Sequence, residues 1–182
     1  MTCIIGLVHE GKVYIGGDRS AVDGWKKNTS AHSKVFRAGE FLFGTCGSHR
    51  MAQVIEHEFK ISASQAVDET DLHYLCTVFA NEIRTLLVGR GIIGKSDDNE
   101  DEYEGGCLVG YKGNLYRLSS NFQIDQFESS FDGIGSGSPF ALGALQVIVR
   151  KGSPKTWIRR SMEVAELLCC DVAAPFDIEV LD

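Results

Sequence analysis

The feature that most constrains the fold is a pair of β-rich runs near the start of the sequence. Residues 3–8 (CIIGLV) and 13–18 (VYIGGD) are separated by only four residues. Loops of this length join antiparallel strands into hairpins. A hairpin centred on that loop places Asp18 opposite Cys3 and close to Thr2. The pairing therefore brings a carboxylate back to the first residues of the sequence.

A second hairpin is predicted from residues 34–37 (KVFR) and 41–44 (FLFG). It places Lys34 about opposite Gly44. The glycines of 44–47 (GTCG) suggest that the backbone approaches another group closely. The two hairpins would carry a carboxylate, an ammonium and a glycine turn toward one end of a sheet, which is typical of a functional site.

Four helices are predicted in two pairs. Apolar residues at helical spacing indicate helices over 48–60, with Ser48 as N-cap, and over 71–88. The second pair opens at two Ser-Pro steps, 138–139 and 153–154. Ser138 would be the N-cap of the third helix, with proline as the first helical residue.

The order of elements predicts an α+β fold. Strands, two helices, strands, two helices and a final strand follow one another, and hairpins dominate. The remaining strand-like runs are 106–118, 122–127, 131–134 and 176–181. Two antiparallel sheets packed face to face, with a helix pair outside each, form the most economical arrangement. We therefore expect a four-layer αββα sandwich in a single domain over 1–182.

Composition excludes several classes of protein. The formal net charge of −7 argues against nucleic acid or an anionic membrane as the main partner. No apolar run approaches the roughly 20 residues that span a bilayer. The N-terminus does not resemble a signal peptide, and the scattered cysteines suit a reducing compartment. We expect a cytoplasmic protein.

No pattern predicts a cofactor or a metal. The six cysteines include no Cys-x-x-Cys pair and no Cys/His cluster at zinc spacing. Six of the eight residues in 97–104 are acidic, but Glu102 occupies the position where an EF-hand needs glycine. A solvated loop is the favoured interpretation of this segment, over a cation or partner site.

Thr2 is the candidate nucleophile. Its small side chain makes Met1 a good substrate for methionine aminopeptidase, and removal of Met1 would leave a threonine with a hydroxyl and a free α-amine. The amine, with an unperturbed pKa of roughly 7.7–8.0, can accept the hydroxyl proton near neutral pH.

The ordered motifs resemble the β-type proteasome subunits and HslV-like peptidases, which are N-terminal nucleophile hydrolases. The matching pieces run in family order and at family spacing: Thr2 after one methionine, GGDRSA around Asp18, KVFR from Lys34, GTCGS at 44–48 and GSGSPF at 135–140. The resemblance covers essentially the whole sequence and implies the same αββα fold.

The resemblance also implies residue roles. Thr2 would be the nucleophile, with its amine as general base. Lys34 would stabilise the ionised hydroxyl, and Asp18 would hold Lys34. The Gly47 N–H would donate to the oxyanion, since a residue without a side chain lets the backbone approach the scissile carbonyl. Ser138 would hydrogen-bond near the threonine amine, with Ser136 as the less favoured choice in the same motif.

The resemblance places four residues near the pocket for the substrate side chain before the cleaved bond. These are Ala21, His32, Phe36 and Cys46. Their mixture of small, aromatic and titratable groups defines no clear cleavage preference.

Two segments depart from the proteasome pattern. The stretch around Gly47 is one residue shorter than in many proteasome subunits. Near the C-terminus, Cys169 falls where those subunits have an aspartate and Val172 where they have a serine. Asp171 could replace the aspartate only if the register shifts.

The sequence is compatible with three functions. The favoured one is a threonine peptidase that forms homo-oligomeric stacked rings and degrades unfolded polypeptides fed by an HslU-like ATPase. The second is a catalytically silent structural or binding subunit, which the departure at 169–174 favours. The third is an amidase acting on small amides, which the short length and the GSGSPF motif disfavour.

Overall fold

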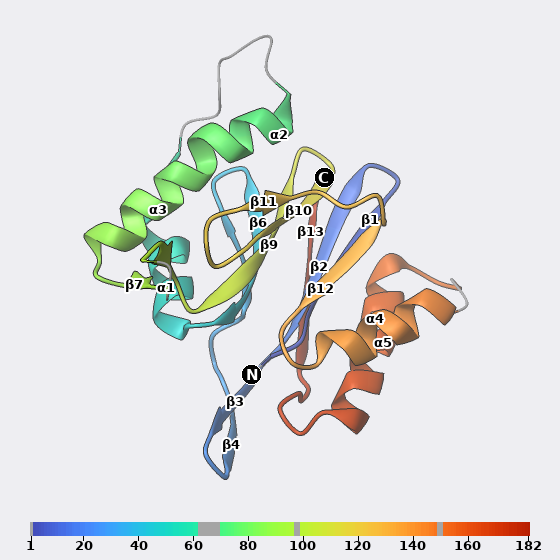
Figure 1. The fold of residues 1–182 in the computed structure, drawn as a ribbon. Coiled ribbons are helices and arrows are strands. Elements are labelled where there is room, and N and C mark those ends of the chain that lie inside the picture. Colours follow the sequence, from blue (N-terminus) through green and yellow to red (C-terminus); the bar gives the residue numbers. More distant parts are fainter. Residues whose placement is uncertain (1, 62–69, 97–98, 149–150) are drawn as a thin grey trace.

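The computed structural model describes residues 2–61, 70–96, 99–148 and 151–182. Two antiparallel sheets pack face to face, and helices cover both outer surfaces (Figure 1). The predicted four-layer αββα arrangement is confirmed. Within the described residues, no helix is long and apolar enough to cross a membrane.

The first sheet has the strand order β12-β1-β2-β13. Its strands are β1 (Ile4–His9), β2 (Lys12–Asp18), β12 (Phe131–Ile134) and β13 (Phe176–Leu181). Ile4 pairs with Gly17, and the Asp18 N–H donates to the Cys3 carbonyl at 3.3 Å. The predicted register of the first hairpin is therefore confirmed, and Asp18 ends its strand beside Thr2.

The second sheet has the order β11-β10-β9-β6-β5. Its strands are β5 (Val35–Ala38), β6 (Phe41–Gly47), β9 (Gly105–Tyr111), β10 (Asn114–Leu118) and β11 (Ile124–Asp125). The predicted pairing of Lys34 with Gly44 is wrong by one residue. Val35 pairs with Gly44, and the Lys34 carbonyl accepts from the Thr45 N–H at 2.9 Å. The turn between β5 and β6 consists of Gly39 and Glu40.

Helices on the second sheet follow the prediction closely. Helix α1 (His49–Glu58) begins after Ser48, whose hydroxyl accepts from the Met51 N–H at 3.2 Å. The second predicted helix is one continuous run of α2 (Asp71–Tyr74), the π-helical turn η1 (Leu75–Phe79) and α3 (Ala80–Gly89).

Helices on the first sheet are α4 (Ser138–Val147) and α5 (Pro154–Leu168). The prediction of Ser138 as the N-cap of α4 is wrong. Gly137 is the cap, because its carbonyl already accepts from the Ala141 N–H at 3.3 Å. Ser138 is the first helical residue instead, and its hydroxyl donates to the Gly135 carbonyl at 2.8 Å.

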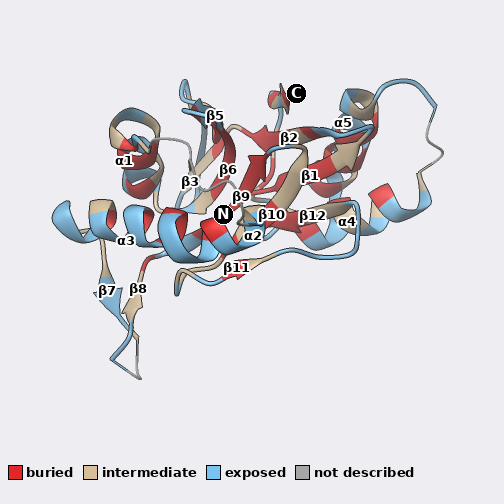
Figure 2. Ribbon diagram, turned by 90° about the horizontal axis from the view of Figure 1, so that it is seen from above, coloured by how far each residue is buried: buried red, intermediate tan, exposed pale blue. Residues whose placement is uncertain are grey.

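Buried strands form the centre of the molecule, with more exposed helices outside (Figure 2). The sheets approach closely where β6 and β1 cross. A Cβ built on Gly44 would lie 2.5 Å from Cγ2 of Ile4 and 2.6 Å from Cγ2 of Ile15. The close approach predicted for this glycine is therefore to the opposite sheet.

Two small ribbons stand outside the sheets. The first consists of β3 (Ser20–Asp23) and β4 (Lys26–Thr29), and it extends away from the sandwich near Thr2 (Figure 1). The second pairs β7 (Gly94–Lys95) with β8 (Asp101–Glu102). Asp101 forms ion pairs with Lys95 and Arg84. The prediction of a solvated loop over 97–104 is therefore wrong at 101–102, which form a strand. Residues 97–98 lie outside the described residues.

Candidate active site

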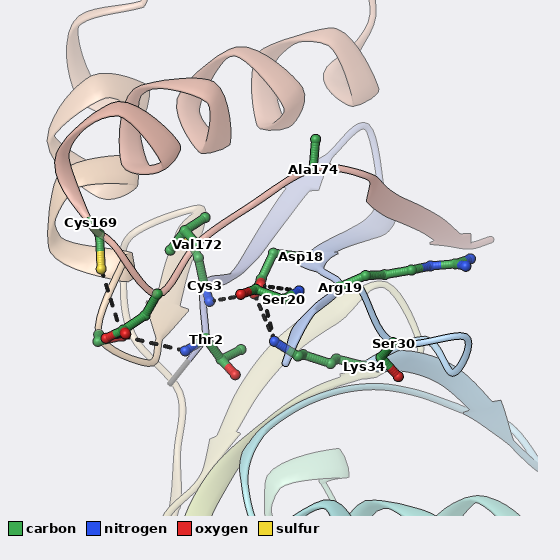
Figure 3. Close-up of polar contacts among 12 residues, drawn as sticks. Thr2, Cys3, Asp18, Arg19, Ser20, Ser30, Lys34, Cys169, Val172 and Ala174 are labelled. Atoms are coloured by element: carbon green, nitrogen blue, oxygen red, sulfur yellow. Dashed lines mark hydrogen bonds and ion pairs between the residues drawn. The ribbon is translucent and has the colours of Figure 1, made fainter. Parts of the chain in front are cut away.

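The predicted catalytic residues Thr2, Asp18 and Lys34 meet at one end of the sandwich (Figure 3). Thr2 lies two residues before β1, Asp18 ends β2, and Lys34 immediately precedes β5. All three are buried, with exposed fractions of 4%, 0% and 5%. The register of β1 with β2 brings the first two together, and the packing of the second sheet adds the third.

Asp18 and Lys34 form a buried ion pair. The Lys34 ammonium lies 3.1 Å from Oδ1 and 3.0 Å from Oδ2 of Asp18. The same two oxygens accept from the backbone N–H groups of Cys3 and Ser20, each at 2.8 Å. A buried carboxylate needs this degree of hydrogen bonding to offset its lost hydration. The pair holds the ammonium in one position beside the threonine.

Two cysteines near the site, Cys3 and Cys46, are neutral thiols near neutral pH. Burial, reinforced by the negative charge of Asp18, raises the pKa of Cys3 to about 12. Burial also raises the pKa of Cys46. Because only the thiolate is a strong nucleophile, neither cysteine competes with the Thr2 hydroxyl near neutral pH.

The loop before α4 wraps around Thr2. The Thr2 carbonyl accepts from the Gly137 N–H at 3.1 Å. Gly135 has φ +90°, and a Cβ built there would lie 2.3 Å from the Thr2 oxygen. Only glycine fits this approach and this backbone conformation.

Ser136 contacts the Thr2 nitrogen, and Ser138 does not fill the predicted role. The Thr2 N–H donates to Oγ of Ser136 at 3.4 Å. The Ser138 hydroxyl is engaged by the Gly135 carbonyl, as described above. The serine before Gly137 is therefore the one that faces the threonine, and the preference for Ser138 over Ser136 is wrong.

The turn after α5 lies against the same loop. Oγ of Ser136 is 3.4 Å from Oδ2 of Asp171 and 3.9 Å from Sγ of Cys169. Val172 is fully buried, and a Cβ built on Gly137 would lie 2.4 Å from its Cγ2. The sequence motifs alone do not indicate that Asp171 reaches Ser136.

A cavity of about 350 Å³ opens beside Thr2. Thr2, Lys34 and Gly47 line it, as do three of the four predicted pocket residues, Ala21, His32 and Cys46. Its wall also includes Thr45, His49 and Glu56, which sequence reasoning missed. The signal for His49 and Glu56 was the predicted start of a helix directly after Gly47, whereas Thr45 belongs to the strand that ends at Gly47.

Phe36 is the exception among the predicted pocket residues. Its ring stacks on Phe43 with centroids 5.6 Å apart, within the core beneath α1. It is not among the residues that line the cavity, so its predicted place is wrong. Neighbouring strand positions face opposite sides of a sheet, and Phe36 lies on the helix side of β5 while Val35 faces the first sheet.

Gly47 requires its glycine for a different reason than expected. It ends β6 opposite Gly105, with φ +90°, and a Cβ there would lie 2.5 Å from the Glu104 oxygen. Contact with the neighbouring strand, rather than the approach of a substrate, excludes a side chain at this position.

Comparison with known proteins supports the predicted resemblance. A proteasome subunit beta of Rhodococcus jostii (strain RHA1) is 26% identical over 89% of this chain. The alignment spans 58% of that relative, so the chain matches little more than half of its length. No family model matches the sequence.

Solved structures share the fold along the whole chain. BPH of Thiobacillus denitrificans, in complex with epoxomicin, superposes with a TM-score of 0.82 at 18% identity, covering 99% of this chain and 98% of that one. The eukaryotic HslV of Trypanosoma brucei gives a TM-score of 0.67 at 19% identity, covering 99% of each chain. The chain has the fold of the proteasome- and HslV-type N-terminal nucleophile hydrolases, and its resemblance to them is confirmed.

Proposed function

We propose that this chain is the threonine-type endopeptidase subunit of a proteasome-like, HslV-like assembly. The observation that carries the proposal is the placement of Thr2 at the wall of a cavity, beside a buried Lys34–Asp18 pair. Met1 lies outside the described residues. The proposal requires that the bond between Met1 and Thr2 be cut, because only then does Thr2 carry a free amine.

Each group then has a defined role in peptide hydrolysis. The Thr2 hydroxyl oxygen attacks the scissile carbonyl carbon, and its proton passes to the Thr2 amine. The Lys34 ammonium stabilises the ionising hydroxyl, and Asp18 holds that ammonium in place. The Gly47 N–H donates to the developing oxyanion.

Collapse of the tetrahedral intermediate completes the first half of the reaction. The amine of Thr2 gives its proton to the leaving nitrogen, and the carbonyl carbon remains attached to Thr2 as an ester. Water then attacks the ester with the amine again acting as base, which releases the second product and restores the hydroxyl.

The cavity supplies the substrate subsite in this proposal. Ala21, His32 and Cys46 line it next to Thr2 and would contact the side chain before the cleaved bond. Unfolded polypeptides are the proposed substrates, since an extended chain can lie across the cavity while a folded domain cannot.

We also propose that the chain forms stacked homo-oligomeric rings in the cytoplasm, served by an HslU-like ATPase. The fold shared with the HslV of Trypanosoma brucei over the whole chain supports this part. Confinement also has a physical reason, because an unspecific peptidase free in solution would degrade other proteins.

A catalytically silent subunit is the second candidate. The observation that favours it is the buried Val172, which packs an apolar side chain where the resemblance implies a serine. In that case Thr2 would occupy the site without a reactive amine or without adequate support.

Intact mass measurement with epoxomicin tests the peptidase proposal. Epoxomicin is bound in the BPH structure of Thiobacillus denitrificans. A peptide epoxyketone also forms a stable ring only with an N-terminal residue that offers a hydroxyl and a free amine. Loss of Met1 and one adduct per chain are expected. Processed protein without adduct and without peptidase activity would support the silent subunit.

A Thr2→Ala variant is the matched control. It should assemble as the unmodified protein does, lose all peptidase activity and form no adduct. Residual cleavage by this variant would assign the activity to a contaminant or to another nucleophile, and the proposal would fail.

A further inference from the structure

We propose that Glu56 makes the cavity beside Thr2 select a long cationic side chain, arginine or lysine, in the residue before the cleaved bond. This inference rests on the proposed function and names the substrate class of the same cavity. One juxtaposition carries it: a half-buried carboxylate lines the cavity that the candidate nucleophile also lines.

The full charges in the cavity wall come from two side chains. Among the described residues that line the cavity, Lys34 is the only lysine or arginine and Glu56 is the only aspartate or glutamate. The Lys34 ammonium is already paired with the buried Asp18 carboxylate, 3.0 Å away. The carboxylate of Glu56 is therefore the charge that remains for a substrate side chain.

Glu56 holds no lysine or arginine within the described part of the chain. Its ion-pair contact is with Nε2 of His57 at 3.8 Å, and the His57 side chain is 68% exposed. A histidine is a cation only when protonated, and an exposed pair of this kind is weak. A substrate cation can therefore approach the carboxylate without breaking a strong ion pair.

Helix α1 directs this carboxylate along the cavity. His49, Ala52 and Glu56 line the cavity at spacings of three and four residues, so they share one face of the helix. Ser48 lines the other end of this wall, about 12 Å from Glu56 along the helix axis. Helical side chains lean toward the N-terminus of their helix, so Glu56 leans back toward Gly47. A long substrate side chain is needed to meet it.

The dipole of α1 favours the same orientation of the substrate. The helix begins directly after Ser48, and its positive end lies next to Gly47, the proposed oxyanion donor. Its negative end lies at the last turn, which carries Glu56 and favours a cation. A substrate with its developing oxyanion at the first end and a cationic head at the second is therefore matched at both.

Small side chains leave room for the stem of such a residue. Ala21 and Ala52 line the cavity, and Cys46 adds a neutral thiol. Lysine and arginine carry an aliphatic stem below the charged head, so the stem can pack on these groups while the head reaches Glu56. An acidic substrate side chain would instead bring a second negative charge toward Glu56.

The test uses peptides that differ only in the residue before the cleaved bond, which is arginine, citrulline or glutamate. Citrulline has nearly the shape of arginine but no charge. Values of kcat/KM are measured near neutral pH with full-length protein that begins at Thr2. Labelled forms of the same peptides are titrated into the Thr2→Ala variant, in which binding is measured without cleavage.

The variants change the charge at Glu56 and at one matched position. Glu58→Gln is the control, because Glu58 lies on the same helix, is paired with Arg90 and does not line the cavity. The unmodified protein should prefer arginine to citrulline about tenfold, in kcat/KM and in affinity. Glu56→Gln should reduce this ratio to about two or less, and Glu58→Gln should preserve it. Glu56→Lys should make the glutamate peptide better than the arginine peptide.

The outcomes separate this inference from the proposed function. Equal cleavage of the arginine and citrulline peptides by an active peptidase overturns the inference and leaves the proposed function intact. A preference for arginine that survives in Glu56→Gln, or that Glu58→Gln also removes, overturns it as well. Binding of the arginine peptide that depends on Glu56, in a protein that cleaves none of the peptides, supports the cation site and rejects the peptidase.

Discussion

At the residue scale, some contacts of the site can be predicted from the sequence and others cannot. The approach of Asp18 to Thr2 follows from hairpin pairing alone and is confirmed. The choice between Ser136 and Ser138 does not follow, because it depends on the path of a loop in which Gly135 has φ +90°.

Lys34→Ala should destabilise the fold and abolish cleavage. The change leaves the fully buried Asp18 carboxylate without its cation, and breaking such a pair costs roughly 3–5 kcal/mol. Urea unfolding at pH 7 measures the loss. In the double variant Lys34→Ala/Asp18→Asn only part of the stability should return, because the buried charge is removed but the amide oxygen can accept from only one of the Cys3 and Ser20 N–H groups. The activity should stay absent. A single variant as stable as the unmodified protein would contradict the burial of the pair.

At the element scale, glycines set how closely the layers approach. Gly16 lies in β2 beneath α5, and a Cβ there would be 2.5 Å from Cγ2 of Ile158. Helix α5 continues into the turn that carries Asp171, so the contact of this helix with the sheet also positions the site.

Gly16→Ala should therefore destabilise the protein by roughly 1–3 kcal/mol, as overpacking does in a dense core. The matched control is Gly143→Ala in α4, where an added Cβ meets nothing within 4 Å and alanine favours the helix. Denaturant midpoints of the two variants should move in opposite directions. Equal effects would contradict the close packing of α5 on β2.

Arg19, which follows β2, forms an ion pair with Asp177 of β13, and the stability that this pair contributes depends on pH. The Arg19 guanidinium lies 2.6 Å and 2.8 Å from the two oxygens of Asp177. Burial alone would raise the pKa of Asp177, but hydrogen bonds from Arg19 and Ser33 outweigh it and lower that pKa. The stability from this pair is thus present above the unfolded pKa, near 4, and is lost as the pH falls through the folded value.

Asp177→Asn should cost about 0.5–1 kcal/mol at pH 7, because the pair is partly exposed to solvent. The difference between the variant and the unmodified protein should be smaller at pH 3, which is below the unfolded pKa of Asp177. Urea unfolding at both pH values measures it. A difference that grows as the pH falls would contradict the lowered pKa.

At the scale of the whole molecule, the four-layer sandwich brings Thr2, Asp18 and Lys34 together (Figure 3), and Thr2, Lys34 and Gly47 line one cavity. Groups from β2, from the segment before β5 and from the loop before α4 converge there. The proposed assembly would enclose this site. The extent of the domain, predicted as 1–182, stays a prediction.

The ring proposal predicts a mass in solution that is a multiple of the single chain, measured by light scattering after gel filtration. Thr2→Ala should show the same mass, because Thr2 is almost fully buried within its own chain. Unmodified protein that stays monomeric at the concentrations used for the activity measurements would contradict the ring proposal. Activity in such a monomer would leave the site chemistry intact.

The sequence by itself determined the order of elements, the antiparallel pairing, the αββα layers and the proximity of Thr2 to Asp18. These follow from local patterns: alternation, helical spacing, short loops and the register that they impose. Tertiary structure decided the rest. The cavity beside Thr2, the burial of Phe36 on the helix side of β5, and the contact of Ser136 with Asp171 each join segments that are far apart in sequence. Local patterns carry no information on how such segments pack, so only the folded chain defines these contacts.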